Sequence, residues 1–187
     1  MKNLKSYSVI LLMLGAGLMS CQKEKTDSLP APAITTINQG NGVIETLQRQ
    51  PNGSTVVFSN WITKVESDWT GFGTTEIKTS INTSSLTDAV RDRGLVLVYY
   101  EDPGGHVHSL PYTNLEFLQT FAMTFITGKI ELSVKIMNSA ISGIIDIRLR
   151  YILIPASSFG NAGSERSVPP VDYNNYEAVC AYYGLQQ

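Results

Sequence analysis

The sequence is poor in several features that mark large protein classes. Two cysteines in 187 residues are too few for the dense disulfide framework of a small secreted scaffold. Charged residues make up only 16% of the chain, and the net charge is −2, so there is no basic footprint for nucleic acid. A hydrophobic fraction of 43% excludes a disordered acidic chain and is sufficient for one packed domain.

No apolar run reaches the roughly 20 residues that a transmembrane helix needs. The apolar run near the N-terminus, Val9 to Met13, follows Lys2 and Lys5 and is followed by the small residues Gly15-Ala16-Gly17. A short positive region, an apolar region and a small-residue cleavage site are the parts of a signal peptide. We therefore expect residues 1–20 to be a signal peptide.

Leu18-Met19-Ser20-Cys21 resembles the bacterial lipobox. The resemblance implies that Cys21 receives lipid and becomes the first residue of the mature chain, although a cysteine that merely ends an ordinary secretory signal is the alternative. Each buried CH₂ of an acyl chain contributes about 0.8 kcal/mol, so a multiply acylated Cys21 would anchor the chain to a membrane without spanning it. The polar, proline-punctuated residues that follow predict a flexible tether over 21–41.

From residue 42 to residue 187, period-2 alternation between turn signals predicts one antiparallel β-sandwich domain of about seven strands. The clearest predicted hairpin joins Lys129–Met137 to Ile144–Tyr151. Its register places apolar side chains on one face and the pairs Lys135–Asp146 and Glu131–Arg150 on the other. A strand over Gln119–Ile126 is expected to pair with the same Lys129 strand, with Ile126 opposite Lys129.

A second hairpin is predicted from Leu95–Glu101 and His106–Tyr112, because Asp102-Pro103-Gly104-Gly105 between them is a strong turn signal. The first of these strands is apolar on both faces, which indicates a position between the core and another covering element. Further strands are expected at Thr55–Ile62 and Glu76–Ile81.

Two helices are expected beside the strands. Ser85-Leu86-Thr87-Asp88 has the form of a capping box and Gly94 is a stop signal, so Leu86–Arg93 is predicted to be a short internal helix. A C-terminal helix is predicted over Tyr173–Tyr183, capped by Asp172. Its apolar stripe at i, i+3, i+4 and i+7 consists of Tyr176, Val179, Cys180 and Tyr183.

Several short segments together resemble an uncharacterised family of Bacteroidota secreted and lipoprotein domains. The segments are GLVLVY at 94–99, LPY at 110–112, YILIP at 151–155 and the aromatic C-terminal stretch that begins with Asp172-Tyr173. The resemblance implies a common fold and a cell-envelope setting. It carries no established activity, because the family has none.

The only two histidines, His106 and His108, share one face of a predicted strand. Pairing Glu101 with His106 across the turn would place a carboxylate beside them, and two histidines with one glutamate are a possible open zinc site. The alternative is an exposed hairpin end in which Glu101 pairs with His106 and His108 packs by Tyr99, and we favour that alternative.

Trp69-Thr70-Gly71-Phe72-Gly73 is predicted to be an exposed loop. An exposed Trp69, with Phe72 beside it, would offer a face on which a sugar ring can stack. The alternative, which we favour, is that Trp61 and Trp69 are core anchors of the sandwich. Cys180 lies on the stripe of the C-terminal helix and is expected to be a buried core thiol.

No pattern in the sequence calls for a cofactor, and no nucleophile elbow or phosphate loop is present. The expected function is that of a lipid-anchored envelope lipoprotein, in the outer membrane, acting as a non-enzymatic module that binds a glycan or an envelope protein. The alternative is a metal-dependent hydrolase that uses His106, His108 and Glu101. Which face of the outer membrane the domain occupies stays open.

Overall fold

The computed structural model of the chain describes residues 33–144, 146–159 and 169–186. The expected signal peptide (1–20), Cys21 and the first part of the expected tether lie outside the described residues. The last part of that tether differs from the expectation, because Ile34–Gly40 forms strand β1. Its four consecutive β-branched residues, Ile34 to Ile37, suit a strand, and the β-structure therefore begins before residue 42.

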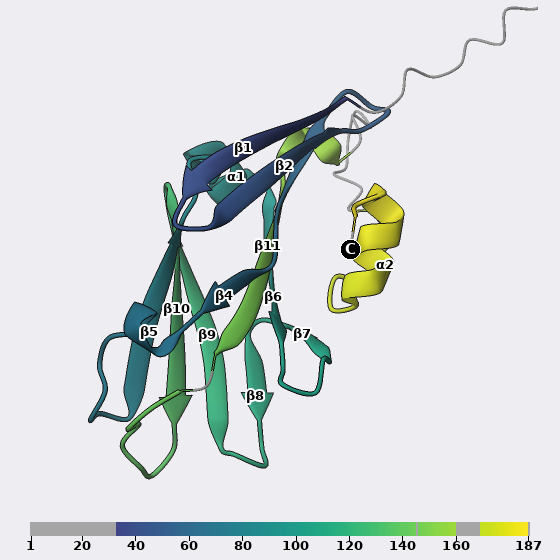
Figure 1. The fold of residues 1–187 in the computed structure, drawn as a ribbon. Coiled ribbons are helices and arrows are strands. Elements are labelled where there is room, and N and C mark those ends of the chain that lie inside the picture. Colours follow the sequence, from purple (N-terminus) through teal and green to yellow (C-terminus); the bar gives the residue numbers. More distant parts are fainter. Residues whose placement is uncertain (1–32, 145, 160–168, 187) are drawn as a thin grey trace, which may run out of the picture.

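Two antiparallel sheets form the body of the described structure (Figure 1), and the expected mainly β, antiparallel sandwich fold is confirmed. The large sheet has the order β1-β2-β3-β11-β6-β7, with β4 also beside β11, and the small sheet has the order β5-β10-β9-β8. The strands of the large sheet are β1, β2 (Val43–Arg49), β3 (Thr55–Ser59), β4 (Ile62–Lys64), β6 (Leu95–Glu101), β7 (Val107–Ser109) and β11 (Ile147–Ile154). Those of the small sheet are β5 (Glu76–Asn82), β8 (Tyr112–Asn114), β9 (Gln119–Ile126) and β10 (Lys129–Ile136).

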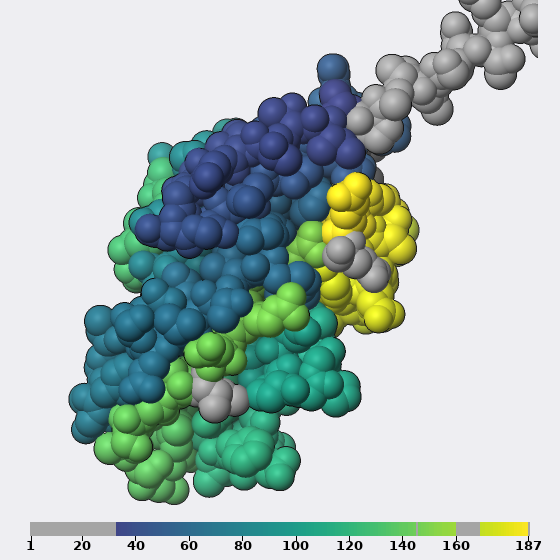
Figure 2. All heavy atoms as spheres, in the orientation of Figure 1, coloured from purple at the N-terminus to yellow at the C-terminus, as the bar shows by residue number. Residues whose placement is uncertain are grey.

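Two helices accompany the sheets, as expected: α1 (Asp88–Arg93) and the C-terminal α2 (Tyr176–Tyr183). Single 3-10 turns occur at η1 (Glu66–Asp68) and η2 (Ala156–Ser158). Figure 2 shows α2 in yellow on the flank of the molecule, against the large sheet.

The large sheet is buried on both faces at β6 and β11. Tyr151 of β11 and Tyr100 of β6 belong to the core between the two sheets. Their chain neighbours Ile152 and Tyr99 point to the opposite face, because side chains alternate along a strand, and they pack in a second cluster with α2. The expected placement of Leu95–Tyr100 between the core and another covering element is thus confirmed.

The predicted register of β9 against β10 is confirmed. Ile126 lies opposite Lys129, Phe125 opposite Ile130 and Phe121 opposite Val134. The tight Thr127-Gly128 connection fixes this register, with Gly128 at a φ of 80°, a conformation that glycine adopts without strain.

The predicted hairpin between Lys129–Met137 and Ile144–Tyr151 is wrong. β10 pairs with β9 and β5, whereas β11 crosses to the large sheet and pairs with β3, β4 and β6. The expected pairs Lys135–Asp146 and Glu131–Arg150 would contribute only about 0–1 kcal/mol each as surface ion pairs. Each large apolar side chain of β11 gains roughly 1.5–3 kcal/mol from burial, and only a central strand of the large sheet buries both of its faces.

The helix starts differ from the expectation by a few residues. α1 is capped by Thr87, whose side chain accepts from Val90 N, and α2 is capped by Asn175, whose side chain accepts from Ala178 N. Gly184 ends α2 with a left-handed φ of 65°, which favours glycine. The buried stripe of α2 is as expected and consists of Tyr176, Val179, Cys180 and Tyr183.

Candidate functional site

The turn after β6 brings both histidines to one carboxylate, but that carboxylate is Asp102. Asp102 Oδ2 lies 3.2 Å from His106 Nδ1 and 3.0 Å from His108 Nε2. The expected pairing of Glu101 with His106 is wrong by one residue, because Glu101 lies opposite Val107. Glu101 instead forms an ion pair with Arg148.

His108 is part of an aromatic stack at the edge of the sandwich. Its ring lies 4.1 Å from that of Tyr112 and 6.0 Å from that of Tyr100, both in stacked geometry. It lies opposite Tyr100 in the strand ladder, so the expected contact with Tyr99 is replaced by one with Tyr100. The stack and the bond to Asp102 hold the imidazole in place.

Asp102 is held in its ionised form. Burial alone would raise the pKa of Asp102, but the hydrogen bonds from the His108 side chain and from the His106 backbone and side chain outweigh it and lower that pKa to about 2. Within the described part of the chain, no group of three or more histidine, cysteine or acidic residues is arranged to hold a metal ion. The alternative zinc site of His106, His108 and Glu101 is therefore not formed in the described residues.

Trp69 is a core residue and not an exposed stacking platform. Its side chain is 4% exposed and packs in the cluster between the two sheets, with Phe72 partly buried against the same cluster. The favoured alternative, a core position for Trp69, is therefore confirmed, and the presentation of Trp69 and Phe72 to a ligand is not, because a large aromatic gains more from burial than from exposure on a loop. Cys180 is buried, as expected.

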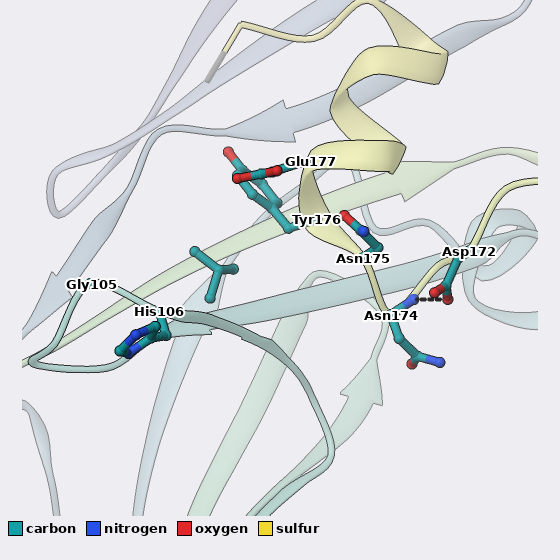
Figure 3. A pocket seen from close by; sticks show the side chains of 8 residues that line it. Gly105, His106, Asp172, Asn174, Asn175, Tyr176 and Glu177 are labelled. Atoms are coloured by element: carbon teal, nitrogen blue, oxygen red, sulfur yellow. Dashed lines mark hydrogen bonds between the residues drawn. The ribbon is translucent and has the colours of Figure 1, made fainter.

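One opening of the described surface lies between the β6–β7 turn and the start of α2. It is a cleft of about 510 Å³. Figure 3 shows His106 on one side, and Asn175 with Glu177 on the other. The lining residues are Gly105, His106, Val107, Asp172, Asn174, Asn175, Tyr176 and Glu177.

Some polar groups of this cleft are engaged and others are free to meet a ligand. Asn175 Oδ1 caps α2 and Asn174 Oδ1 accepts from Ser109 Oγ. Among the described residues, the Glu177 carboxylate and His106 Nε2 have no hydrogen-bond or ion-pair partner. No lysine or arginine lines the cleft, whereas Asp172 and Glu177 give it two carboxylates.

The large sheet holds the α2 wall of the cleft at both ends. Tyr99 Oη donates to Tyr173 O at 2.8 Å, just before the helix. Gln48 Nε2 donates to Tyr183 O and Gly184 O, both at 3.0 Å, and so satisfies carbonyls at the helix C-terminus. These hydrogen bonds fix the position of α2, which forms one wall of the cleft.

The comparisons with known proteins give no family for this chain: no family model, no curated protein and no solved structure matches it. None of the helices in the described ranges has the length and apolar character needed to cross a membrane.

Proposed function

We propose that this chain is a lipid-anchored lipoprotein of the bacterial cell envelope, in the outer membrane, and that its sandwich domain is a non-enzymatic module that binds neutral glycans. The observation that carries the binding proposal is the cleft of about 510 Å³ beside α2. This volume lies within the roughly 300–1,000 Å³ of small-molecule sites. The lipobox-like residues at Leu18–Cys21 support the anchor.

The chemistry of the cleft supports a neutral, hydroxyl-rich ligand. Carboxylates such as Glu177 accept hydrogen bonds from hydroxyl groups, and amide side chains such as Asn174 both donate and accept them. Asp172 and Glu177 repel anions, and no lining cation offsets them. A sugar chain meets both conditions, because its hydroxyls donate and accept without carrying charge.

A glycan titration tests the binding proposal. The probes are maltohexaose, xylohexaose, mannohexaose and laminarihexaose, followed by amide chemical shifts of the isolated domain. We expect one of them to shift amides of residues 105–107 and 172–177, and we expect Glu177→Gln to weaken it by roughly tenfold, since a hydrogen bond to a charged group contributes about 1.5–3 kcal/mol. Glu116→Gln, on the β8–β9 turn, is the matched control.

The absence of shifts in residues 105–107 and 172–177 with all four hexasaccharides would contradict the glycan ligand. Equal binding by the wild type and Glu177→Gln would contradict the assigned cleft.

Metabolic labelling with an alkyne fatty acid tests the anchor. We expect label on the wild-type protein and none on Cys21→Ser, while Cys180→Ser keeps the label because that thiol is buried in the domain. Label on Cys21→Ser would contradict lipidation at this residue. Protease treatment of intact cells then assigns the face: loss of the domain places it outside, and survival until the envelope is broken places it in the periplasm.

A further inference from the structure

A second, smaller cavity lies where the β1–β2 turn meets β4 and β5. Its volume is about 190 Å³, below the range of sites for drug-sized ligands. It is lined by Gly40, Asn41, Val43, Lys64, Asp68, Thr79, Ser80, Ile81 and Asn82. None of these residues lines the cleft beside α2, so the two openings are separate.

Lys64 is the unusual residue of this cavity. It is the last residue of β4 and only 9% exposed, and no hydrogen bond or ion pair joins its ammonium to another described residue. Burial lowers the pKa of Lys64, and the attraction of Asp68 offsets part of that effect. The ammonium is therefore free to pair with an acceptor that a ligand supplies.

The ammonium is nevertheless accessible from the cavity. The only side-chain nitrogen or oxygen of the described residues that is both fully enclosed and unpartnered is Trp69 Nε1. Lys64 Nζ has no partner and lies in a buried residue, so it retains accessible surface, and the cavity that Lys64 lines is where that surface opens. The same reasoning applies to the hydroxyl of Thr79, which is 8% exposed and lines the same cavity.

The other groups that line the cavity indicate which further functional groups a ligand would carry. A hydrogen bond fixes the Asp68 carboxylate at the cavity, because its Oδ2 accepts from Val65 N at 3.0 Å. It can accept from a ligand hydroxyl, as can the hydroxyl of Thr79. The side chains of Ser80 and Asn82 point to the other face of β5, since side chains alternate along a strand. The lining thus combines Lys64 as a partner for an anionic group with Asp68 and Thr79 as partners for hydroxyls.

We propose that this cavity binds a small hydroxylated carboxylic acid of the uronic acid type, whose carboxylate pairs with Lys64 and whose hydroxyls bond to Thr79 and Asp68. This site is additional to the glycan cleft and does not depend on it. Its charge differs from that of the cleft beside α2: the cleft has two carboxylates and no lysine or arginine, whereas this cavity has one lysine beside one carboxylate, Asp68.

The test is a calorimetric titration of the full chain with D-glucuronate, D-glucose and inorganic phosphate. We expect glucuronate to bind at least about tenfold more tightly than glucose, since a charge-assisted hydrogen bond contributes about 1.5–3 kcal/mol. Lys64→Met removes the ammonium but keeps an unbranched stem, and we expect it to weaken glucuronate by the same factor. Lys78→Met is the matched control, because Lys78 lies on β5, is 65% exposed and pairs with Glu76.

Three results would overturn the proposal: equal affinity for glucose and glucuronate, phosphate binding as tight as glucuronate, or unchanged binding in Lys64→Met. If Lys64→Met does not fold, Thr79→Val replaces it, because that change removes one hydroxyl at constant shape and should weaken glucuronate while leaving the thermal midpoint within a few degrees. Glu177→Gln should leave glucuronate binding unchanged, which separates this site from the glycan cleft.

Discussion

Two glutamates lie in contrasting surroundings in two regions of the molecule: one is buried and hydrogen-bonded, and the other is exposed and unpaired within the described part of the chain. Glu45, on β2, is 0% exposed and accepts hydrogen bonds from Tyr151 Oη, Ser85 Oγ and Gln39 Nε2, each at 2.6 Å, and from Thr83 Oγ1. Glu177 is exposed at the cleft beside α2 and has no partner among the described residues. A buried carboxylate needs hydrogen-bond donors from the protein for its oxygens. A carboxylate that binds a ligand must keep its oxygens free of such donors.

Arg150 extends the comparison to positive charge. It is 4% exposed, and its guanidinium donates to Ser59 O at 2.8 Å, to Gln186 O at 2.6 Å and to Tyr176 Oη. Lys64 is comparably buried but has no such bonds within the described residues. Arg150 thus ties α2 to the large sheet, whereas Lys64 is suited to a ligand.

The largest effect on stability is expected for Glu45→Ala. The change leaves the hydroxyls of Thr83 and Tyr151 buried without their acceptor, and each such group costs about 1–3 kcal/mol, so the free energy of unfolding should fall by about 2–6 kcal/mol in urea denaturation. Glu177→Ala should stay within about 0.5 kcal/mol of the wild type. The comparison fails if the two variants unfold at the same urea concentration.

Arg150→Met should have the next largest effect. Three hydrogen bonds from a charged donor are lost, but the cost of burying that charge is lost with them, and we expect a net loss of about 2–3 kcal/mol in the free energy of unfolding. Arg148→Met is the matched control on the same strand, because Arg148 is 48% exposed, pairs with Glu101 and otherwise lies over the ring of Trp61. It should cost at most about 1 kcal/mol, and an equal loss in both variants would contradict the tie to α2.

Alkaline pH should then unfold the domain through its buried tyrosines. Burial raises the pKa of Tyr176 to about 12 and also raises those of Tyr99, Tyr151 and Tyr183. The unfolded chain loses these protons near pH 10, so the folded state binds more protons between pH 10 and 12 and stability falls with rising pH. Urea midpoints measured from pH 8 to 12 should fall steeply above 10, and less so in Tyr176→Phe; a flat profile would contradict the burial.

Acid pH should give the smallest of these effects. The bonds from His106 and His108 lower the pKa of Asp102 to about 2 in the folded state, against about 3.9 in the unfolded chain. The stability that Asp102 contributes is therefore present above about pH 4 and is lost as the pH falls toward 2. Asp102→Asn should remove part of the slope of the thermal midpoint in this range, and an identical slope in both proteins would show that Asp102 does not contribute it.

The parts of the fold that the sequence predicts well depend on local contacts. The β9–β10 register follows from a two-residue turn, and the α2 stripe from helical spacing. The partners of β11 depend on residues far along the chain, such as Phe58, which pairs with Ile152. A local alternation pattern contains no information on which distant strand is nearer, and this is why the β10–β11 hairpin was wrongly predicted.

The candidate sites were harder to predict than the fold. His106 and His108 were recognised by their spacing, but a one-residue difference in the turn exchanged Glu101 for Asp102. Lys64 and Glu45 carried a detectable signal, since each is a charged residue at an inward position of a strand. Whether the charged group of such a residue has hydrogen-bond partners depends on residues of other strands. Spacing along the sequence does not reveal these partners.

The most direct test of the account measures glycan binding and unfolding on the same variants. Glu177→Gln and Glu45→Gln are titrated with the hexasaccharide that shifts residues 172–177, and both are unfolded in urea. The account predicts that Glu177→Gln loses roughly tenfold in affinity at unchanged stability. It predicts that Glu45→Gln loses stability and, where folded, keeps the wild-type affinity. Unchanged affinity in Glu177→Gln, or no loss of stability in Glu45→Gln, would contradict it.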